Sequence, residues 1–264
     1  MIDRGAGVPV VLVPGVQGRW EWMSATVRAL EKHVRVVTYS LCDEPASGFS
    51  CDTSKGLTAY VEQVRDVMDR AGIERAVIAG SSYGGLIACE FAASHPQRVM
   101  GLVLASALPL GWRPDARARF YMRAPRLFVP VFGVMSQLRM LPEINAAMPM
   151  TRRVRFVLDA LRQAFRSPVS PALMARRARW TESYTYCDPS RINVPALVIT
   201  GEEHLDRIVP TVQTRQYLTR LRRARHVTLK GTGHLGIVTK PQEFAELVAQ
   251  FVRDLPNDAQ RISA

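Results

Sequence analysis

The chain of 264 residues lacks any apolar run that approaches the roughly 20 residues needed to cross a bilayer. Its first apolar segment, residues 8–13, is stopped at once by Pro14 and Gly15. No small-residue cleavage pattern of a secretory signal peptide follows this segment. The sequence therefore predicts a protein with neither a spanning helix nor a signal peptide, and the cytoplasm is the expected compartment.

Cysteine and clustered metal ligands are also scarce. The four cysteines, Cys42, Cys51, Cys89 and Cys187, occur without a CxxC pair. Cys42 and Cys51 share one loop, so a bridge between them is conceivable, but a cytoplasmic compartment favours free thiols. No cluster of histidine and cysteine has the spacing of a zinc site, and no metal or organic cofactor is expected.

Acidic residues are few between residues 113 and 179, where only Asp115, Glu143 and Asp159 occur. Much of the net charge of +12 therefore lies in this segment. One interpretation is attraction to an anionic substrate or an acidic membrane surface. The other, which we favour from the sequence, is a solvated helical face. No nucleic-acid partner is expected, because no recognition motif accompanies the charge. The basic residues include Arg117, Arg119, Arg123, Arg126, Arg139, Arg152, Arg153, Arg155, Arg162, Arg166, Arg176 and Arg177.

The sequence does contain short β-branched runs that alternate with longer helical patterns, which is typical of a parallel sheet with crossover helices. An apolar content of 47% and a charged content of 22% fit such a folded domain. The fold class predicted is α/β, with a mostly parallel, doubly wound sheet. Strands are predicted over residues 8–13, 34–40, 76–79, 99–105, 196–200 and 226–229, and helices over residues 20–32, 57–71, 86–94, 211–221 and 242–253.

The alternation stops between residues 108 and 188, where the patterns are helical or irregular. Helices are predicted over residues 151–165 and 171–180, the second with Ser170 as its N-cap. The segment is too long to be a plain connection. Because it joins two strands, it should lie over their carboxyl ends, where open α/β sheets bind ligands. We predict a core of residues 1–107 and 189–264 and a helical lid of residues 108–188.

The pentapeptide Gly80-x-Ser82-x-Gly84 lies between a predicted strand and a predicted helix, which is the context of a nucleophile elbow. A serine on such a sharp turn projects clear of the backbone, and its neighbours two residues away must be small. The following helix N-terminus directs N–H groups at the serine. Ser81 is a rival only by adjacency, so Ser82 is the predicted nucleophile.

A serine hydroxyl needs a base, and the base needs a carboxylate that orients it. His234 follows the last predicted strand at its carboxyl end, whereas His33, His95 and His226 lie at the ends of predicted elements and His204 in a loop. Asp206 follows the strand at residues 196–200, with Glu202 and Glu203 as alternatives in the same loop. The predicted triad is Ser82, Asp206 and His234.

These residues occur in the order serine, acid, histidine, and here the sequence resembles the α/β-hydrolase fold superfamily over nearly its whole length. The resemblance rests on VLVPG at residues 11–15, GSSYGG at 80–85, DRIVP at 206–210 and GTGH at 231–234. It is greatest with the small bacterial lid-bearing serine hydrolases. It implies an oxyanion hole formed by the N–H groups of Val16 and Tyr83.

The chain departs from the family pattern at three places. Pro14-Gly15 replaces the His-Gly that many relatives carry after the first core strand, and the loop before Asp206 holds two extra residues. The usual N-terminal strand pair is reduced or missing, so either the protein lacks it or the sequence begins inside a longer product.

The chemistry that the resemblance implies is two-step acyl transfer, and a small-molecule carboxylic ester with an apolar acyl group is the expected substrate. Arg19, Trp20 and Trp22 closely follow the oxyanion loop and are candidate substrate contacts. A thioesterase or a C–C bond hydrolase would use the same triad, and a ligand-sensing protein with negligible turnover is the alternative outside the enzymes. Apolar residues of the predicted lid that could line an acyl pocket are Phe120, Tyr121, Leu127, Phe128, Phe132, Met135, Met140, Met148 and Met150.

Overall fold

The computed structural model describes residues 1–256, with the side chains of residues 129–134 outside the description. Seven strands form one sheet in the order β1-β3-β2-β4-β5-β6-β7, in which only β1 runs antiparallel to its neighbour. The strands are β1 (Ile2–Arg4), β2 (Pro9–Val13), β3 (Arg35–Thr38), β4 (Ala76–Ser81), β5 (Val99–Ala105), β6 (Ala196–Thr200) and β7 (Ala224–Thr228).

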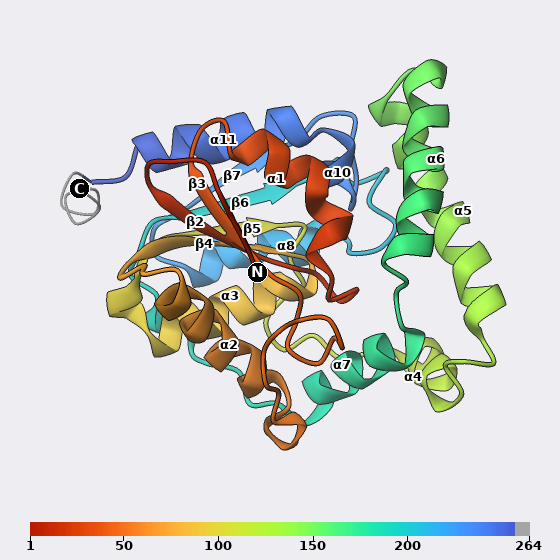
Figure 1. The fold of residues 1–264 in the computed structure, drawn as a ribbon, viewed down its shortest axis with the longest axis horizontal. Helices are drawn as coiled ribbons and strands as arrows, with labels where there is room; N and C mark the ends of the chain where they lie inside the picture. Colours follow the sequence, from red (N-terminus) through yellow and green to blue (C-terminus); the bar gives the residue numbers. More distant parts are fainter. Residues whose placement is uncertain (257–264) are drawn as a thin grey trace.

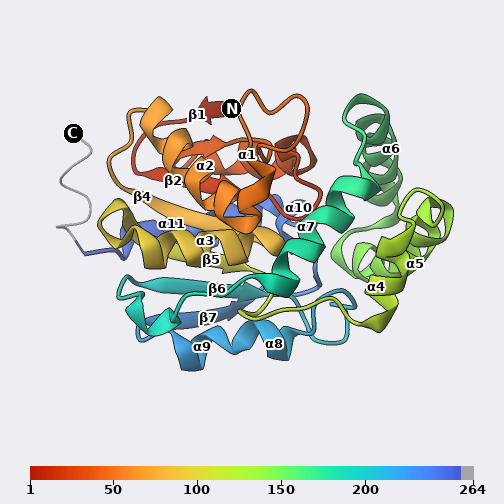
Figure 2. The same cartoon turned by 90° about the horizontal axis from the view of Figure 1, so that it is seen from below.

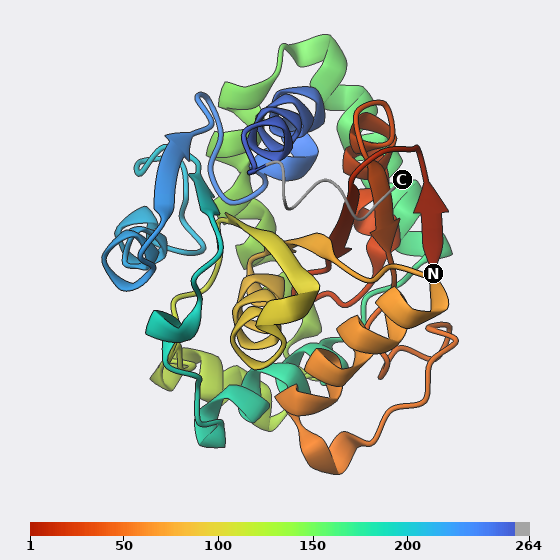
Figure 3. The same cartoon turned by 90° about the vertical axis from the view of Figure 1, so that its left-hand side faces the viewer.

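Helices cover both faces of the sheet (Figure 3). One buried cluster lies between the sheet and the helices α2, α3 and α9, and a second lies between the sheet and the helices α1 and α11. The central strands β2, β4, β5 and β6 are nearly continuous apolar runs because both of their faces are covered. The helices of this core are α1 (Ser24–Leu30), α2 (Leu57–Arg70), α3 (Tyr83–Ser94), α8 (Thr211–Arg215), α9 (Tyr217–Arg220), α10 (Gly236–Thr239) and α11 (Pro241–Arg253).

The six predicted strands and the doubly wound parallel sheet are confirmed. The three residues of β1 were not predicted, and they form a single antiparallel edge strand, in keeping with a reduced N-terminal pair. The predicted helix over residues 20–32 begins with the 3₁₀ turn η1 (Trp20–Met23). The helix predicted over residues 211–221 is two short helices, α8 and α9.

Between β5 and β6 lies a helical insertion, residues 108–188, that contains α4 (Ala116–Arg123), α5 (Val129–Ala147), α6 (Met150–Arg166) and α7 (Pro171–Ser183). Ser170 accepts a hydrogen bond from the N–H of Leu173, as expected for its predicted capping role. In both views of Figures 1 and 2, α4, α5 and α6 lie to one side of the sheet. Contacts of α5 and α7 with loops after β2, β3 and β7 place the insertion at the carboxyl edge of the sheet.

The direction of the winding changes between β2 and β4, which are neighbours in the sheet. The chain after β2 leads to α1 on one face, and the chain after β4 leads to α3 on the other. Such a switch point opens a crevice at the carboxyl ends of the strands. The turn after β2 and Ser82 after β4 both lie at this crevice.

Candidate active site

Ser82 occupies a backbone conformation that few residues other than glycine adopt, with φ 54° and ψ −119°. It lies between the end of β4 and the first residue of α3, and a strained conformation of this kind costs about 1–3 kcal/mol. The turn is so tight that a Cβ atom on Gly80 would lie 2.3 Å from the carbonyl oxygen of Gly84. The two glycines of the pentapeptide therefore allow the tight turn that Ser82 occupies.

The turn after β2 packs directly against Ser82. It is closed by a hydrogen bond of 2.9 Å from the N–H of Gly18 to the carbonyl of Gly15. A Cβ atom on Gly15 would lie 3.6 Å from Cβ of Ser82. Val16 lies in this turn, and Tyr83 is the first residue of α3. Within the described part of the chain, the N–H groups of these two residues donate to no protein acceptor. They are therefore available to a ligand beside the serine.

The loops that carry the predicted base and acid are packed backbone to backbone. A Cβ atom on Gly201 would lie 2.4 Å from the carbonyl oxygen of Thr232, and one on Gly233 would lie 2.5 Å from that of Leu205. The N–H of Glu202 donates to the carbonyl of Thr232 over 2.7 Å. Only glycine permits so close an approach at positions 201 and 233, and this approach brings Asp206 beside His234.

Nδ1 of His234 and Oδ2 of Asp206 face one another across 3.6 Å. Both atoms are buried, and neither makes a hydrogen bond among the described residues. The other carboxylate oxygen, Oδ1, accepts from the N–H groups of Ile208 and Val209, which fixes the carboxylate in place. No hydrogen bond joins Ser82 and His234 within the described structure; such bonds are often long before substrate binds.

The alternative acids have other roles. Glu202 accepts from the N–H of Gly231 and lies 3.7 Å from Nε2 of His204, while Glu203 is exposed. Two of the other histidines also have partners of their own. His226 shares a hydrogen bond with Thr200, and His95 stacks on the ring of Phe91. Of the carboxylates in the acid loop, Asp206 is the one that the fold presents to His234.

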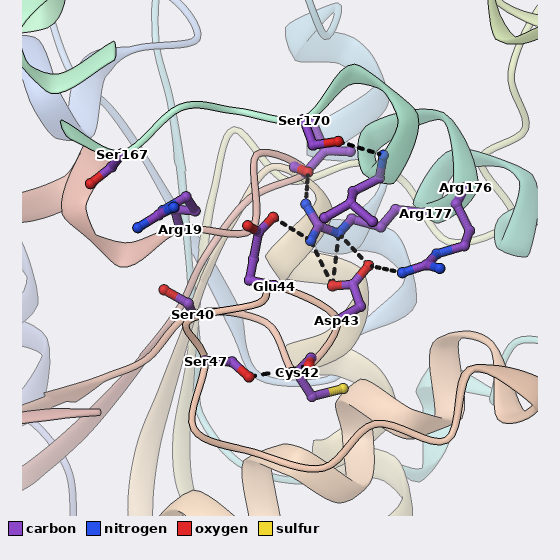
Figure 4. A network of polar contacts seen from close by, with 12 residues as sticks. Arg19, Ser40, Cys42, Asp43, Glu44, Ser47, Ser167, Ser170, Arg176 and Arg177 are labelled. Carbon is purple, nitrogen blue, oxygen red and sulfur yellow. Dashed lines mark hydrogen bonds and ion pairs between the residues drawn. The ribbon is translucent and has the colours of Figure 1, made fainter. Parts of the chain in front are cut away.

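Arg177 of α7 was grouped with the solvated arginines of the insertion, and for this residue that interpretation is wrong. Its side chain is fully buried between the equally buried carboxylates of Asp43 and Glu44 (Figure 4). It also donates to the carbonyl of Val16 over 2.8 Å. Burial opposes the charge, but the hydrogen bonds and charge of Asp43 outweigh it and raise the pKa of Arg177. The insertion is thereby bonded to the turn that carries a predicted oxyanion donor.

The three predicted substrate contacts have partners within the fold. Arg19 pairs with Glu21 over 2.7 Å, and Nε1 of Trp22 donates to the carbonyl of Ser167 in the insertion. Trp20 packs against the buried cluster beneath α1. These contacts hold the segment after β2 against the insertion, and direct contact with substrate stays a prediction.

The apolar residues that were predicted to line an acyl pocket do not share one environment. Phe120, Tyr121 and Phe128 contact one another, with ring centroids 5.1–5.9 Å apart. Leu127 is exposed, whereas Met148 is buried. The side chain of Phe132 lies outside the described residues. A pocket for an acyl group therefore stays a prediction.

Glu143 of α5 is a buried carboxylate that the sequence analysis did not select. Its Oε2 atom accepts from the N–H of Leu235 over 2.9 Å, and the N–H of Gly233 also donates to this carboxylate. Glu143 therefore accepts hydrogen bonds from the backbone on both sides of His234. Burial raises the pKa of the Glu143 carboxyl, although these N–H groups and the nearby imidazole of His234 act in the opposite direction. The sequence gave no signal of this role, because the contact joins two residues that are 92 positions apart.

Replacement of Glu143 with glutamine is expected to change the pH dependence of stability. Because the folded protein raises the pKa of this carboxyl, its contribution is complete below the unfolded value of 4.5 and is lost as the pH rises through the folded value. The free energy of unfolding of Glu143→Gln should therefore rise relative to that of the wild type as the pH increases. Urea unfolding of both proteins over a pH series measures the difference.

The matched control for this comparison is Glu203→Gln, which removes an exposed carboxylate from the acid loop. It is expected to change the free energy of unfolding by less than about 0.5 kcal/mol. A difference between Glu143→Gln and the wild type that does not vary with pH would contradict the prediction.

Within the described residues, no group of three or more histidine, cysteine, aspartate or glutamate side chains is arranged to hold a metal ion. All four cysteines are free, including Cys42 and Cys51. None of the helices described is both long and apolar enough to cross a membrane.

A mostly parallel sheet with a serine on a positive-φ turn, an acid loop and a histidine loop at its carboxyl edge defines the class of α/β-hydrolases. The sequence model of the Alpha/beta hydrolase family matches residues 10–247. The chain therefore belongs to this family.

Curated relatives include 2-hydroxymuconate semialdehyde hydrolase of Pseudomonas sp. (strain CF600), with 26% identity over 99% of this chain and 92% of that protein. Pimeloyl-[acyl-carrier protein] methyl ester esterase of Yersinia enterocolitica is also 26% identical, over 78% of this chain and 80% of the relative. Among solved structures, the enol-lactonase of Burkholderia xenovorans LB400 superposes with a TM-score of 0.74, at 20% identity and with 96% and 95% of the two chains covered. The first two relatives support hydrolase activity, and the third supports the fold.

Proposed function

We propose that this protein is a serine hydrolase that cleaves a small carboxylic ester with an apolar acyl group, with Ser82, His234 and Asp206 as its catalytic residues. The observation that carries the proposal is the strained turn at Ser82, at the same sheet edge as an imidazole that faces a buried carboxylate. A serine is held in such a conformation only where the surrounding structure enforces it.

In the proposed reaction, the Ser82 hydroxyl attacks the ester carbonyl while Nε2 of His234 accepts its proton. The negative oxygen of the tetrahedral intermediate accepts from the N–H groups of Val16 and Tyr83, each donor contributing about 3 kcal/mol. His234 then protonates the departing alcohol, and a water molecule activated by the same imidazole releases the acid. Asp206 holds the imidazole in the required orientation and stabilises its charged form.

The helical insertion is proposed to act as the lid of this site. Glu143 and Arg177 connect α5 and α7 to the histidine loop and to the turn after β2. A cover bonded to two catalytic loops would exclude water and position those loops together. The relatives named for a methyl ester and for a semialdehyde favour a carbonyl compound as substrate.

A fluorophosphonate probe tests the central claim, because it reacts with serines that a base activates. We expect a single covalent adduct, located by peptide mass spectrometry at Ser82. Hydrolysis of p-nitrophenyl esters of increasing acyl length then tests the substrate class. Absence of both labelling and ester turnover in the folded protein would contradict the proposal.

Thioesters and diketones in the same panel separate the alternatives. A thioesterase or a C–C bond hydrolase would label at Ser82 but prefer those substrates. A ligand-sensing protein would bind compounds of the panel tightly with negligible turnover. The C–C alternative is favoured by one of the comparisons, because 2-hydroxymuconate semialdehyde hydrolase matches 99% of this chain.

A further inference from the structure

Helix α6 presents an apolar stripe that the rest of the described structure leaves uncovered. Its large apolar side chains on this stripe are between 44% and 88% exposed, and Phe165 is the most exposed of them. No residue of the helix is buried. The stripe consists of Met150, Val154, Val157, Leu158, Leu161 and Phe165.

The spacing of these residues places them on one side of the helix. At 100° per residue they span an arc of roughly 100°, as in an amphipathic surface helix. Phe156, Ala160 and Gln163, which are half-buried, lie on a different arc and face the protein. The helix is therefore already packed through one side, and its apolar stripe faces outward. In Figures 1 and 2, α6 lies at the edge of the molecule, beyond the sheet.

The side of α6 that borders the stripe is basic. Arg155, Arg162 and Arg166 follow the stripe around the helix, and Arg152 and Arg153 occur in its first turn. Asp159 is the only acidic residue of the helix, and it pairs with Arg162 over 3.0 Å. Five arginines against one aspartate give the helix a net charge of +4.

An apolar stripe beside arginine side chains matches the interface of an anionic membrane. The apolar side chains would enter the boundary between headgroups and acyl chains, and the arginines would meet the phosphates. A second copy of this chain fits the surface less well, because it would bring two strongly basic helices together. An acidic surface removes this repulsion and replaces it with attraction.

We propose that α6 is an interfacial helix that docks the protein on anionic lipid surfaces, with Leu161 and Phe165 inserted and Arg155, Arg162 and Arg166 facing the headgroups. The docking does not depend on the proposed catalysis. It would deliver apolar substrates from the bilayer to a site that the same insertion borders.

Sedimentation with sucrose-loaded vesicles tests the proposal. The wild type is expected to bind vesicles of phosphatidylcholine mixed with phosphatidylglycerol at low salt, to bind phosphatidylcholine alone weakly, and to dissociate as sodium chloride is added. The variant Leu161→Ser/Phe165→Ser should bind these vesicles at least about tenfold more weakly than the wild type. Each arginine of the flank changed to glutamine should lower the partition coefficient about fivefold.

Val212→Ser is the matched control, because Val212 is an apolar side chain of α8 that is 61% exposed outside the insertion. It should bind as the wild type does, and so should Ser82→Ala, which separates this proposal from the catalytic one. Circular dichroism and thermal unfolding check that the α6 variants are folded. Failure of the wild type to bind anionic vesicles at low salt would overturn the proposal. An equal loss of vesicle binding in Val212→Ser would also overturn it. So would a dimer in solution that the substitutions Leu161→Ser/Phe165→Ser dissociate while vesicle binding stays unchanged.

Discussion

Replacement of Ser82 with alanine is expected to lower kcat/KM for any ester that the protein hydrolyses by at least about 10⁴-fold. Loss of the nucleophile removes the covalent step, and in a comparable serine triad the loss reaches about 10⁶-fold. Alanine also lacks the attachment point for a fluorophosphonate, so labelling should disappear. Initial rates on the best ester of the panel, with active-site titration of the wild type, measure the effect.

Ser81→Ala is the control, because Ser81 is the adjacent serine at the end of β4 and does not occupy the positive-φ turn. It should retain activity within about tenfold of the wild type and should still be labelled. Removal of the hydroxyl group at Ser82 should not unfold the protein, since alanine keeps Cβ and introduces no larger group. Activity that survives in Ser82→Ala but is lost in Ser81→Ala would refute the assignment of the nucleophile.

Replacement of Arg177 with methionine is expected to lower the free energy of unfolding by about 3–5 kcal/mol. The carboxylates of Asp43 and Glu44 would stay buried without the cation that neutralises them, and the Val16 carbonyl would lose its donor. A displaced turn would also misalign the Val16 N–H, so kcat should fall more than KM rises. Urea unfolding and ester kinetics measure the two effects.

Arg155→Met removes an arginine of the same insertion whose side chain is 86% exposed and whose ion pair with Asp159 spans 4.0 Å. Its free energy of unfolding should stay within about 0.5 kcal/mol of the wild type. If Arg177→Met does not fold, the double variant Arg177→Met/Asp43→Asn should recover part of the stability, because it removes one of the stranded charges. Equal stability of Arg177→Met and Arg155→Met would contradict the importance of the buried cluster.

The sheet was predictable because the strands that form its centre are covered on both faces. Residues 99–105 and 196–200 are such apolar runs, and their predicted bounds agree with β5 and β6. The strand β1 escaped prediction because three residues, largely exposed, carry no hydrophobic period. The start of α3 was placed three residues late, since the sequence pattern gives no measure of how sharply the chain turns after Ser82.

The candidate site was predictable where glycine constrains the backbone. Gly80 and Gly84 mark the tight turn around Ser82, and Gly233 marks the close approach of the histidine loop. Glu143 and Arg177 carry no such mark. Each is a single charged residue of a predicted insertion helix or irregular segment, and its burial results from packing against loops more than 90 positions away in sequence.

By itself, the sequence determined the parallel α/β sheet, the turn that presents Ser82 and the loops that carry Asp206 and His234, because hydrophobic period and glycine requirements are local properties of the chain. Only the tertiary structure decided which charges are buried. It enclosed Arg177 between two carboxylates, set Glu143 against the histidine loop and left the apolar stripe of α6 in solvent. Burial depends on which elements meet, and that is settled by packing across the whole fold.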